Sequence, residues 1–224
     1  MNTTTDSSTG RGEKIIYKIG MVIVRLGLAY LFFTQLWWKL PPSFGCSNNY
    51  AFPKPTAGNS YDVNGSSGLC YWMGLESINA SKPRPVLIAD MRAGGLPAIS
   101  VDIAPLARMN GFLLDNVFIP NIRIFGWLVW LSEFTIFLTM LLGLFTRFGG
   151  LVAIGISMQL YVGLANIPQP FEWEWSYGAM VLLSIAMFAA TPGRYFGVDA
   201  WLRKLVDRPS LKGKLLAKLV LLLS

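Results

Sequence analysis

Three charged residues stand in apolar stretches of this sequence, where charge is rare. Arg25 interrupts the run "MVIVRLGLAYLFFTQLWW", Lys39 follows it, and Glu133 lies within "WLVWLSEFTIFL". Ionisable groups inside a membrane are costly, and they usually mark pathways or reactive sites. Two interpretations stay open for Arg25 and Glu133. They form a buried ion pair that locks two helices together, or they take part in proton or quinone chemistry.

The spacing of these residues predicts polar stripes on two helices. Arg25 and Lys39 lie about 40° apart on a helical wheel, and Glu133 and Arg147 have the same spacing. Each pair is therefore expected on one face of its helix. For Lys39, a terminal lysine that snorkels to the membrane interface is the plain alternative.

Aromatic and charged residues gather at one predicted end of these helices. Trp38 precedes Lys39, and Glu172 and Trp173 belong to the segment "FEWEWSY". An aromatic belt explains the tryptophans but not the acids among them. With Arg92 from the long polar interval, we predict a charged outer mouth that attracts a small divalent anion. The alternative is that these charges only keep a long loop solvated.

Composition places the helices in a membrane. Of 224 residues, 53% are hydrophobic and 14% charged, and the mean hydropathy is +0.47. Soluble domains carry roughly a quarter charged residues. The net charge of +7 suits basic residues facing a cytoplasmic leaflet, and no basic stripe interleaved with aromatics indicates nucleic acid. Histidine is absent, which excludes its usual haem, zinc and copper sites and predicts no metal or haem ligated by this chain alone.

The elements that must position these residues are helices. We predict an all-α membrane protein, a four-transmembrane-helix bundle, because four segments approach the ~20 apolar residues that a span needs. The predicted spans are approximately 15–38, 122–145, 148–166 and 175–190.

The remaining segments complete the predicted organisation. Residues 1–14 form a cytoplasmic tail, 15–198 a membrane domain with an extracytoplasmic cap over 40–121, and 199–224 an amphipathic helix on the membrane surface. Most basic residues outside the cap fall on one side, so both termini are predicted to be cytoplasmic in a multi-pass cell (inner or plasma) membrane protein.

The two cysteines both lie in the predicted cap. Cys46 and Cys70 would then face an oxidising compartment, which favours a structural disulfide. A redox pair that handles sulfur is the functional alternative, although nothing nearby indicates a lowered thiol pKa.

Four motifs in order resemble the DoxX/DoxD family over about two-thirds of the chain. They are "RLGLAYLFFTQLWWKL", "FLLDNVFIPNIRIFGWLVWLSEFTIFLTMLLGLFTR", "FEWEWSY" and "TPGRYFGVDAWL". The resemblance implies four membrane helices. One branch of the family is the small membrane subunit of thiosulfate:quinone oxidoreductase (TQO), which couples two thiosulfates to tetrathionate and passes two electrons to quinone. This chain departs from the short members in its long outer interval, and it lacks the glycine that many relatives show soon after the helical glutamate.

Two functions of different classes follow. In the first, the chain is a subunit of a quinone-linked oxidoreductase with bound quinone. Its expected catalytic residues are Arg25, Glu133 and Lys39, and its expected substrate-binding or quinone-binding residues are Trp38, Arg92, Glu172, Trp173 and Arg147. In the second, it is an accessory subunit of a larger respiratory or photosynthetic assembly that binds membrane lipid and other membrane or peripheral subunits. A small transporter is a weaker third idea, because no inverted repeat is evident.

Overall fold

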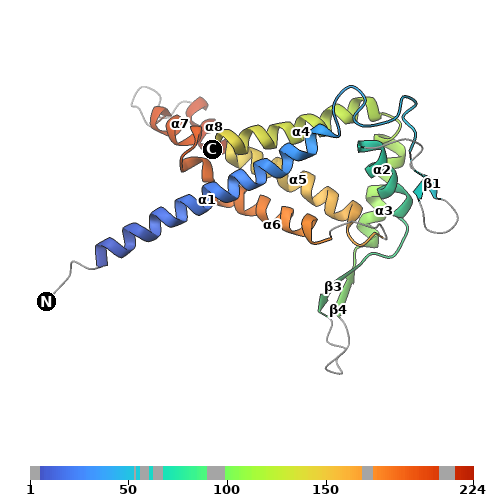
Figure 1. The fold of residues 1–224 in the computed structure, drawn as a ribbon, viewed down its shortest axis with the longest axis horizontal. Helices are drawn as coiled ribbons and strands as arrows, with labels where there is room; N and C mark the ends of the chain where they lie inside the picture. Colours follow the sequence, from blue (N-terminus) through green and yellow to red (C-terminus); the bar gives the residue numbers. More distant parts are fainter. Residues whose placement is uncertain are drawn as a thin grey trace. The chain divides into compact units, whose positions relative to one another are not determined.

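The computed structural model describes residues 6–52, 54–55, 61–62, 68–89, 99–167, 174–206 and 215–224. These residues are predominantly α-helical (Figure 1). The chain divides into two compact units, whose boundaries fall inside the four longest helices. Unit 1 comprises Met1–Thr34, Glu133–Ile154 and Leu182–Ser224, and unit 2 comprises Gln35–Ser132 and Gly155–Val181. Each unit is described by itself.

The four longest helices carry the apolar segments. They are α1 (Asp6–Trp37), α4 (Ile122–Leu142), α5 (Thr146–Leu164) and α6 (Glu174–Ala190). Among the described residues, three segments are long and apolar enough to cross a membrane: Gly12–Trp37, Ile122–Leu142 and Thr146–Leu164. Large apolar side chains such as Ile16 and Leu182 are well exposed on these helices, as lipid-facing side chains would be. The chain is therefore a multi-pass membrane protein.

The fourth predicted span is shorter than the other three. The described apolar segment of α6, Ser176–Ala190, falls below the ~20 residues that a span usually needs. The four-span topology therefore stays a prediction.

The helix ends differ from the sequence-based expectation at two charged residues. Helix α1 ends at Trp37, so Lys39 lies in the following turn instead of on the helix. Helix α4 ends at Leu142, because Gly143 and Phe145 adopt positive φ angles of 63° and 50°. Arg147 is consequently the second residue of α5. The prediction that Glu133 and Arg147 share a stripe on one helix is wrong.

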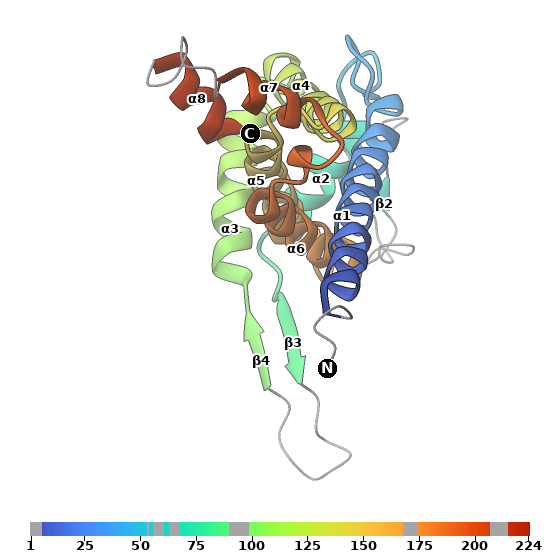
Figure 2. The same ribbon diagram turned by 90° about the vertical axis from the view of Figure 1, so that its left-hand side faces the viewer.

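Unit 2 contains the long polar interval. The residues of this interval that the structure describes form helices and short strands. Its helical elements are α2 (Gly68–Asn79), α3 (Ala104–Leu113) and the π-helical turn η2 (Leu114–Phe118). Two antiparallel pairs add short strands: β1 (Lys54–Pro55) with β2 (Tyr61–Asp62), and β3 (Pro85–Ala89) with β4 (Ile99–Asp102). The second pair is visible as a hairpin in Figure 2. The location of the polar interval outside the membrane remains a prediction.

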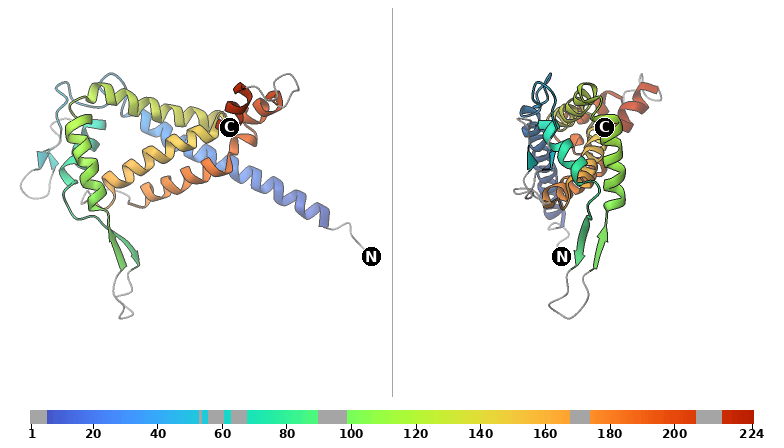
Figure 3. Two further views of the ribbon diagram at one scale, coloured as in Figure 1. Left: turned by 180° about the vertical axis from the view of Figure 1, so that it is seen from behind. Right: turned by 90° about the vertical axis from the view of Figure 1, so that its right-hand side faces the viewer.

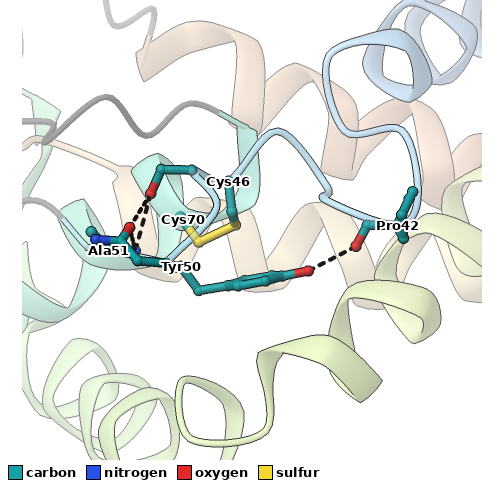
Figure 4. The surroundings of a disulfide bond; sticks show 7 residues. Pro42, Cys46, Tyr50, Ala51 and Cys70 are labelled. Carbon is teal, nitrogen blue, oxygen red and sulfur yellow. Dashed lines mark hydrogen bonds between the residues drawn. A yellow bond between two sulfur atoms is a disulfide. The ribbon is translucent and has the colours of Figure 1, made fainter.

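A disulfide joins the start of this interval to α2. The Cys46–Cys70 bond lies in a core that includes Phe44, Met73 and Leu114. Beside it, the Tyr50 hydroxyl donates to the Pro42 carbonyl over 2.9 Å (Figure 4). The predicted disulfide is therefore confirmed in the structure.

Two glycines allow the backbone to pass closely beside this disulfide. Gly45 and Gly68 have positive φ angles of 73° and 52°. A Cβ on Gly45 would collide with the Trp38 carbonyl oxygen, and one on Gly68 would collide with the Phe44 carbonyl oxygen. Glycine is the residue that satisfies both the angle and the space.

Unit 1 ends in three short helices. The 3₁₀ turn η3 (Pro192–Arg194) follows α6, and α7 (Val198–Val206) and α8 (Leu215–Leu223) come after it. Figure 3 shows α7 and α8 near each other at the C-terminal end of the chain. In α7, Asp199 is buried while Trp201 is exposed, so the helix has an inner polar contact and an outer apolar face.

Replacing Cys46 and Cys70 together with alanine is expected to destabilise the fold. The bond closes a segment with a sequence separation of 24. Releasing that loop costs about 3 kcal/mol of unfolding free energy in the chain-entropy model. Thermal unfolding in detergent should show a lower midpoint for the variant, and reductant should lower the wild-type midpoint only. A wild-type protein that stays equally stable after complete reduction would contradict this.

Candidate functional site

Arg25 of α1 is buried in unit 1 and bonded to the main chain of the loop after α6. Its Nη1 donates to the carbonyls of Pro192 and Tyr195 and its Nη2 to the carbonyl of Phe196, each over 3.4 Å. Asp199 is its favourable electrostatic neighbour. These donors of the guanidinium are directed to the loop after α6, and the ion pair of Arg25 with Glu133 stays a prediction.

Asp199 ties the same loop to the turn between α4 and α5. Its Oδ1 accepts from the Phe145 amide over 2.7 Å. Its Oδ2 accepts from the Thr146 amide over 3.0 Å and from the Thr146 hydroxyl over 2.8 Å. The Asp199 amide donates in turn to the Gly143 carbonyl over 2.9 Å. A carboxylate thus caps the N-terminus of α5, where the helix dipole favours negative charge.

Close approach of the backbone makes this cluster possible. A Cβ on Gly143 would collide with Nη1 of Arg25, and one on Gly193 would collide with Oδ2 of Asp199. Three sequence features, "GLFTR", "TPGR" and "GVDAW", therefore meet in a single hydrogen-bonded assembly. Its role is architectural: it holds Arg25 and Asp199 in place.

The other two predicted residues of unit 1 are in different environments. Glu133 is buried, near the middle of α4. Arg147 is partly exposed at the start of α5. Burial, together with the positive charges of Arg203 and Arg147, lowers the pKa of Arg194. Arg147 therefore belongs to a group of cations.

Lys39 in unit 2 is buried within an aromatic group. The side chain is only 4% exposed, and its Nζ lies 4.6 Å from the centre of the Trp38 ring. Trp38 meets Trp72 of α2 edge to face at 6.1 Å, and Trp72 meets Tyr71 at 5.1 Å. A snorkelling lysine would be exposed, so that alternative does not describe Lys39. An ammonium over a tryptophan ring can bind an anion or donate to a carbonyl.

A second polar group in unit 2 is centred on Glu76. This side chain of α2 is 3% exposed, and its Oε2 accepts from Asn110 of α3 over 2.9 Å and from Gln159 of α5 over 2.7 Å. Burial raises the pKa of Glu76 to about 7, against smaller opposing effects of these two hydrogen bonds and of the charge on Arg84. Gly163 leaves the space for this carboxyl, because a Cβ there would collide with Oε2.

Arg84 is also buried. Its Nη1 donates to the Ala165 carbonyl over 2.6 Å. Its Nη2 donates to the carbonyls of Gly163 and Asn79 over 3.1 Å and 3.2 Å. The guanidinium therefore caps the C-terminal ends of α5 and α2, where carbonyls lack helical partners.

Sequence reasoning missed the part played by Glu76 and Arg84. The one available signal for Glu76 was its position one helical turn after Trp72 in the apolar stretch "LCYWMGLES". No short-range pattern indicated Asn110 or Gln159, because they come from distant segments. Three predicted site residues, Arg92, Glu172 and Trp173, lie outside the described residues.

Replacing Asp199 with asparagine is expected to destabilise unit 1 by about 2 kcal/mol, since a charged acceptor of three hydrogen bonds is replaced by a neutral one. Thermal unfolding in detergent should show the loss. Glu13→Gln is the matched control, because Glu13 is exposed on α1. Equal midpoints for Asp199→Asn and the wild type would contradict the capping role.

The comparison with protein families agrees with these motifs. A family model described as "TQO small subunit DoxD" matches residues 103–224, more than half of the chain. The matched part includes Glu133, Arg147 and Asp199, whereas Arg25, Lys39 and Glu76 precede it. No curated protein and no solved structure matches the chain. With the membrane helices and the assembly that the "TPGR" and "GVDAW" segments build, this match shows that the chain belongs to the DoxD family.

Proposed function

We propose that this chain is the membrane-embedded subunit of a TQO-like complex that passes electrons from thiosulfate to quinone. The family match supports the class of protein. The observation that carries the proposal within the chain is the buried Lys39 against Trp38, with Trp72 beside it. This arrangement combines a cation with aromatic faces, in a protein that crosses a membrane.

The group around Lys39 suits the chemistry of a quinone head. A quinone has two carbonyl oxygens on a flat ring, and it takes up two electrons and two protons when it is reduced. The Lys39 ammonium would donate a hydrogen bond to one carbonyl, and the faces of Trp38 and Trp72 would pack against the ring. Excluding water from the ammonium strengthens its interaction with an acceptor.

Thiosulfate would be the electron donor at the same mouth. It is a small divalent anion, so a positive potential draws it. We assign this attraction to Lys39 and Arg92, with Glu172 and Trp173 at the rim. The sequence has no histidine and both cysteines form the disulfide, so we propose that a partner subunit completes the electron path. A direct route through the sulfurs of Cys46 and Cys70 is the alternative.

The residues of unit 1 have different proposed roles. Arg25 is a positioning residue, because its donors hold the loop of Pro192 and Phe196. Glu133 is buried in a membrane helix, which suits a group that binds a proton. Arg147 lies near Arg194 and Arg203, and this positive group suits the cytoplasmic side.

We propose a four-span topology in the cell membrane with both termini cytoplasmic and the interval 40–121 outside. The C-terminal helices support it. Trp201 of α7 and Leu215 and Leu222 of α8 are exposed beside the exposed Lys204 and Lys218. Apolar side chains next to lysines suit a helix lying on an anionic lipid surface.

Lys39→Gln is expected to raise the KM for quinone by about 10- to 100-fold in thiosulfate-dependent quinone reduction, because a charge-assisted hydrogen bond worth roughly 1.5–3 kcal/mol is lost. The assay uses the complex purified in mild detergent with its co-purifying subunits identified, and the salt concentration is varied. The variant should show a flatter salt dependence. Lys204→Gln is the matched control, since it removes the same charge from an exposed site on α7.

Two results would count against this function. Unchanged kinetics in Lys39→Gln would remove Lys39 from the site. A complete complex with no activity would favour the accessory-subunit alternative, in which the folded interval binds a peripheral protein.

The topology has a separate test. In the variant with both Cys46 and Cys70 replaced by alanine, a cysteine introduced by Ser81→Cys is expected to react with a membrane-impermeant thiol reagent in whole cells, because Ser81 is exposed and the proposed orientation puts the interval outside. The double alanine variant gives the background. Labelling that appears only after lysis would reverse the orientation.

A further inference from the structure

The Glu76 carboxyl is the one buried acid described in unit 2 whose surroundings resemble those of a neutral carboxylic acid. Both amide donors, from Asn110 and Gln159, end on the same oxygen, Oε2. A protonated carboxyl has one oxygen that only accepts and one that carries the proton. The observed contacts make Oε2 the accepting oxygen, which leaves Oε1 as the atom that carries the proton.

The charges around Glu76 are few. Asn110 of α3 and Gln159 of α5 are neutral, so the charged neighbour is Arg84. The described donors of Arg84 are directed to main-chain carbonyls at the ends of α5 and α2. Its charge therefore opposes the effect of burial only weakly, and the pKa of Glu76 stays near neutrality, at about 7.

The position of Glu76 connects it to the aromatic group around Lys39. Trp72 and Glu76 are four residues apart on α2, so they lie on the same face one turn apart. Trp72 contacts Trp38, and the ammonium of Lys39 lies over the Trp38 ring. The hydrogen bonds from Asn110 and Gln159 hold the carboxyl, and Gly163 leaves room for it, because a side chain there would collide with Oε2. A fixed acid thus stands one helical turn from the proposed quinone contact.

We propose that Glu76 is a proton-exchanging carboxyl that donates a proton to the quinone chemistry of unit 2 and is then reprotonated from the medium. The donating part of this inference rests on the proposed function, and the proton-binding part does not. Two thiosulfates give up two electrons as a sulfur–sulfur bond forms between them in tetrathionate. The quinone takes these electrons and two protons. The Glu76 carboxyl supplies one proton from Oε1 and becomes a carboxylate, and the medium supplies the other.

Infrared spectroscopy of the detergent-purified complex tests proton binding without any assay of activity. The wild-type protein is expected to show the carbonyl stretch of a protonated carboxylic acid that disappears as the pH rises through about 7. Glu76→Gln should lack this band, and Glu133→Gln should keep it. No titrating band in the wild type, or the same band in Glu76→Gln, would overturn the inference.

A second variant assigns the infrared band to Glu76 while keeping the Glu76 carboxyl in place. Asn110→Ala removes one hydrogen bond that lowers the pKa of Glu76, so the midpoint should move to higher pH. Asn116→Ala is the matched control, because Asn116 is exposed and donates to the Phe112 carbonyl instead. An unmoved midpoint in Asn110→Ala would assign the proton to another group.

Activity then tests the donating role. Wild-type quinone reduction should slow as the pH rises through about 7, because the donor becomes ionised. Glu76→Gln should be slower by about 100-fold and lose this dependence, as expected for removal of a general acid. An unchanged pH profile in an active Glu76→Gln complex would overturn proton donation. A titrating band in a complete complex without activity would support proton binding while refuting the proposed function.

Discussion

Three of the buried charged residues that the structure describes are bonded to the ends of helices and to the turns between them. Arg25 donates to the carbonyls of the loop after α6, and Arg84 donates to the last carbonyls of α5 and α2. Asp199 accepts from the first amides of α5. A buried ion must replace the hydrogen bonds that it made with water, and main-chain groups without helical partners can form them. Both units use this solution, each with its own residues.

Close packing at these points depends on glycine. Gly143 and Gly193 leave room for Arg25 and Asp199 in unit 1, and Gly163 leaves room for Glu76 in unit 2. In each case a methyl group would occupy the position of a charged atom. Each glycine therefore provides the space for one polar side chain, and replacing the glycine with a larger residue would displace that side chain.

Five buried charged residues of the described chain separate into two groups by what they contact. Arg25, Arg84 and Asp199 are committed to the main chain, and they define where loops and helix ends lie. Lys39 lies over the Trp38 ring, and Glu76 accepts from two neutral amides. Buried ionisable groups in such surroundings are candidates for chemistry. This division supports placing the proposed redox chemistry in unit 2 and a structural role in Arg25.

The sequence by itself determined the class of protein, the three strongest apolar helices and the family, because long apolar runs and ordered motifs are local signals. It also indicated the Cys46–Cys70 bond through the compartment in which both cysteines are expected. Only the tertiary structure decided which partners the buried charges have. Asp199 lies far from Phe145 in the chain, and Glu76 lies far from Gln159, so no spacing rule could pair them. Helix wheels placed Arg147 with Glu133, but the turn at Gly143 ended the helix first, since backbone conformation overrides periodicity wherever a helix stops.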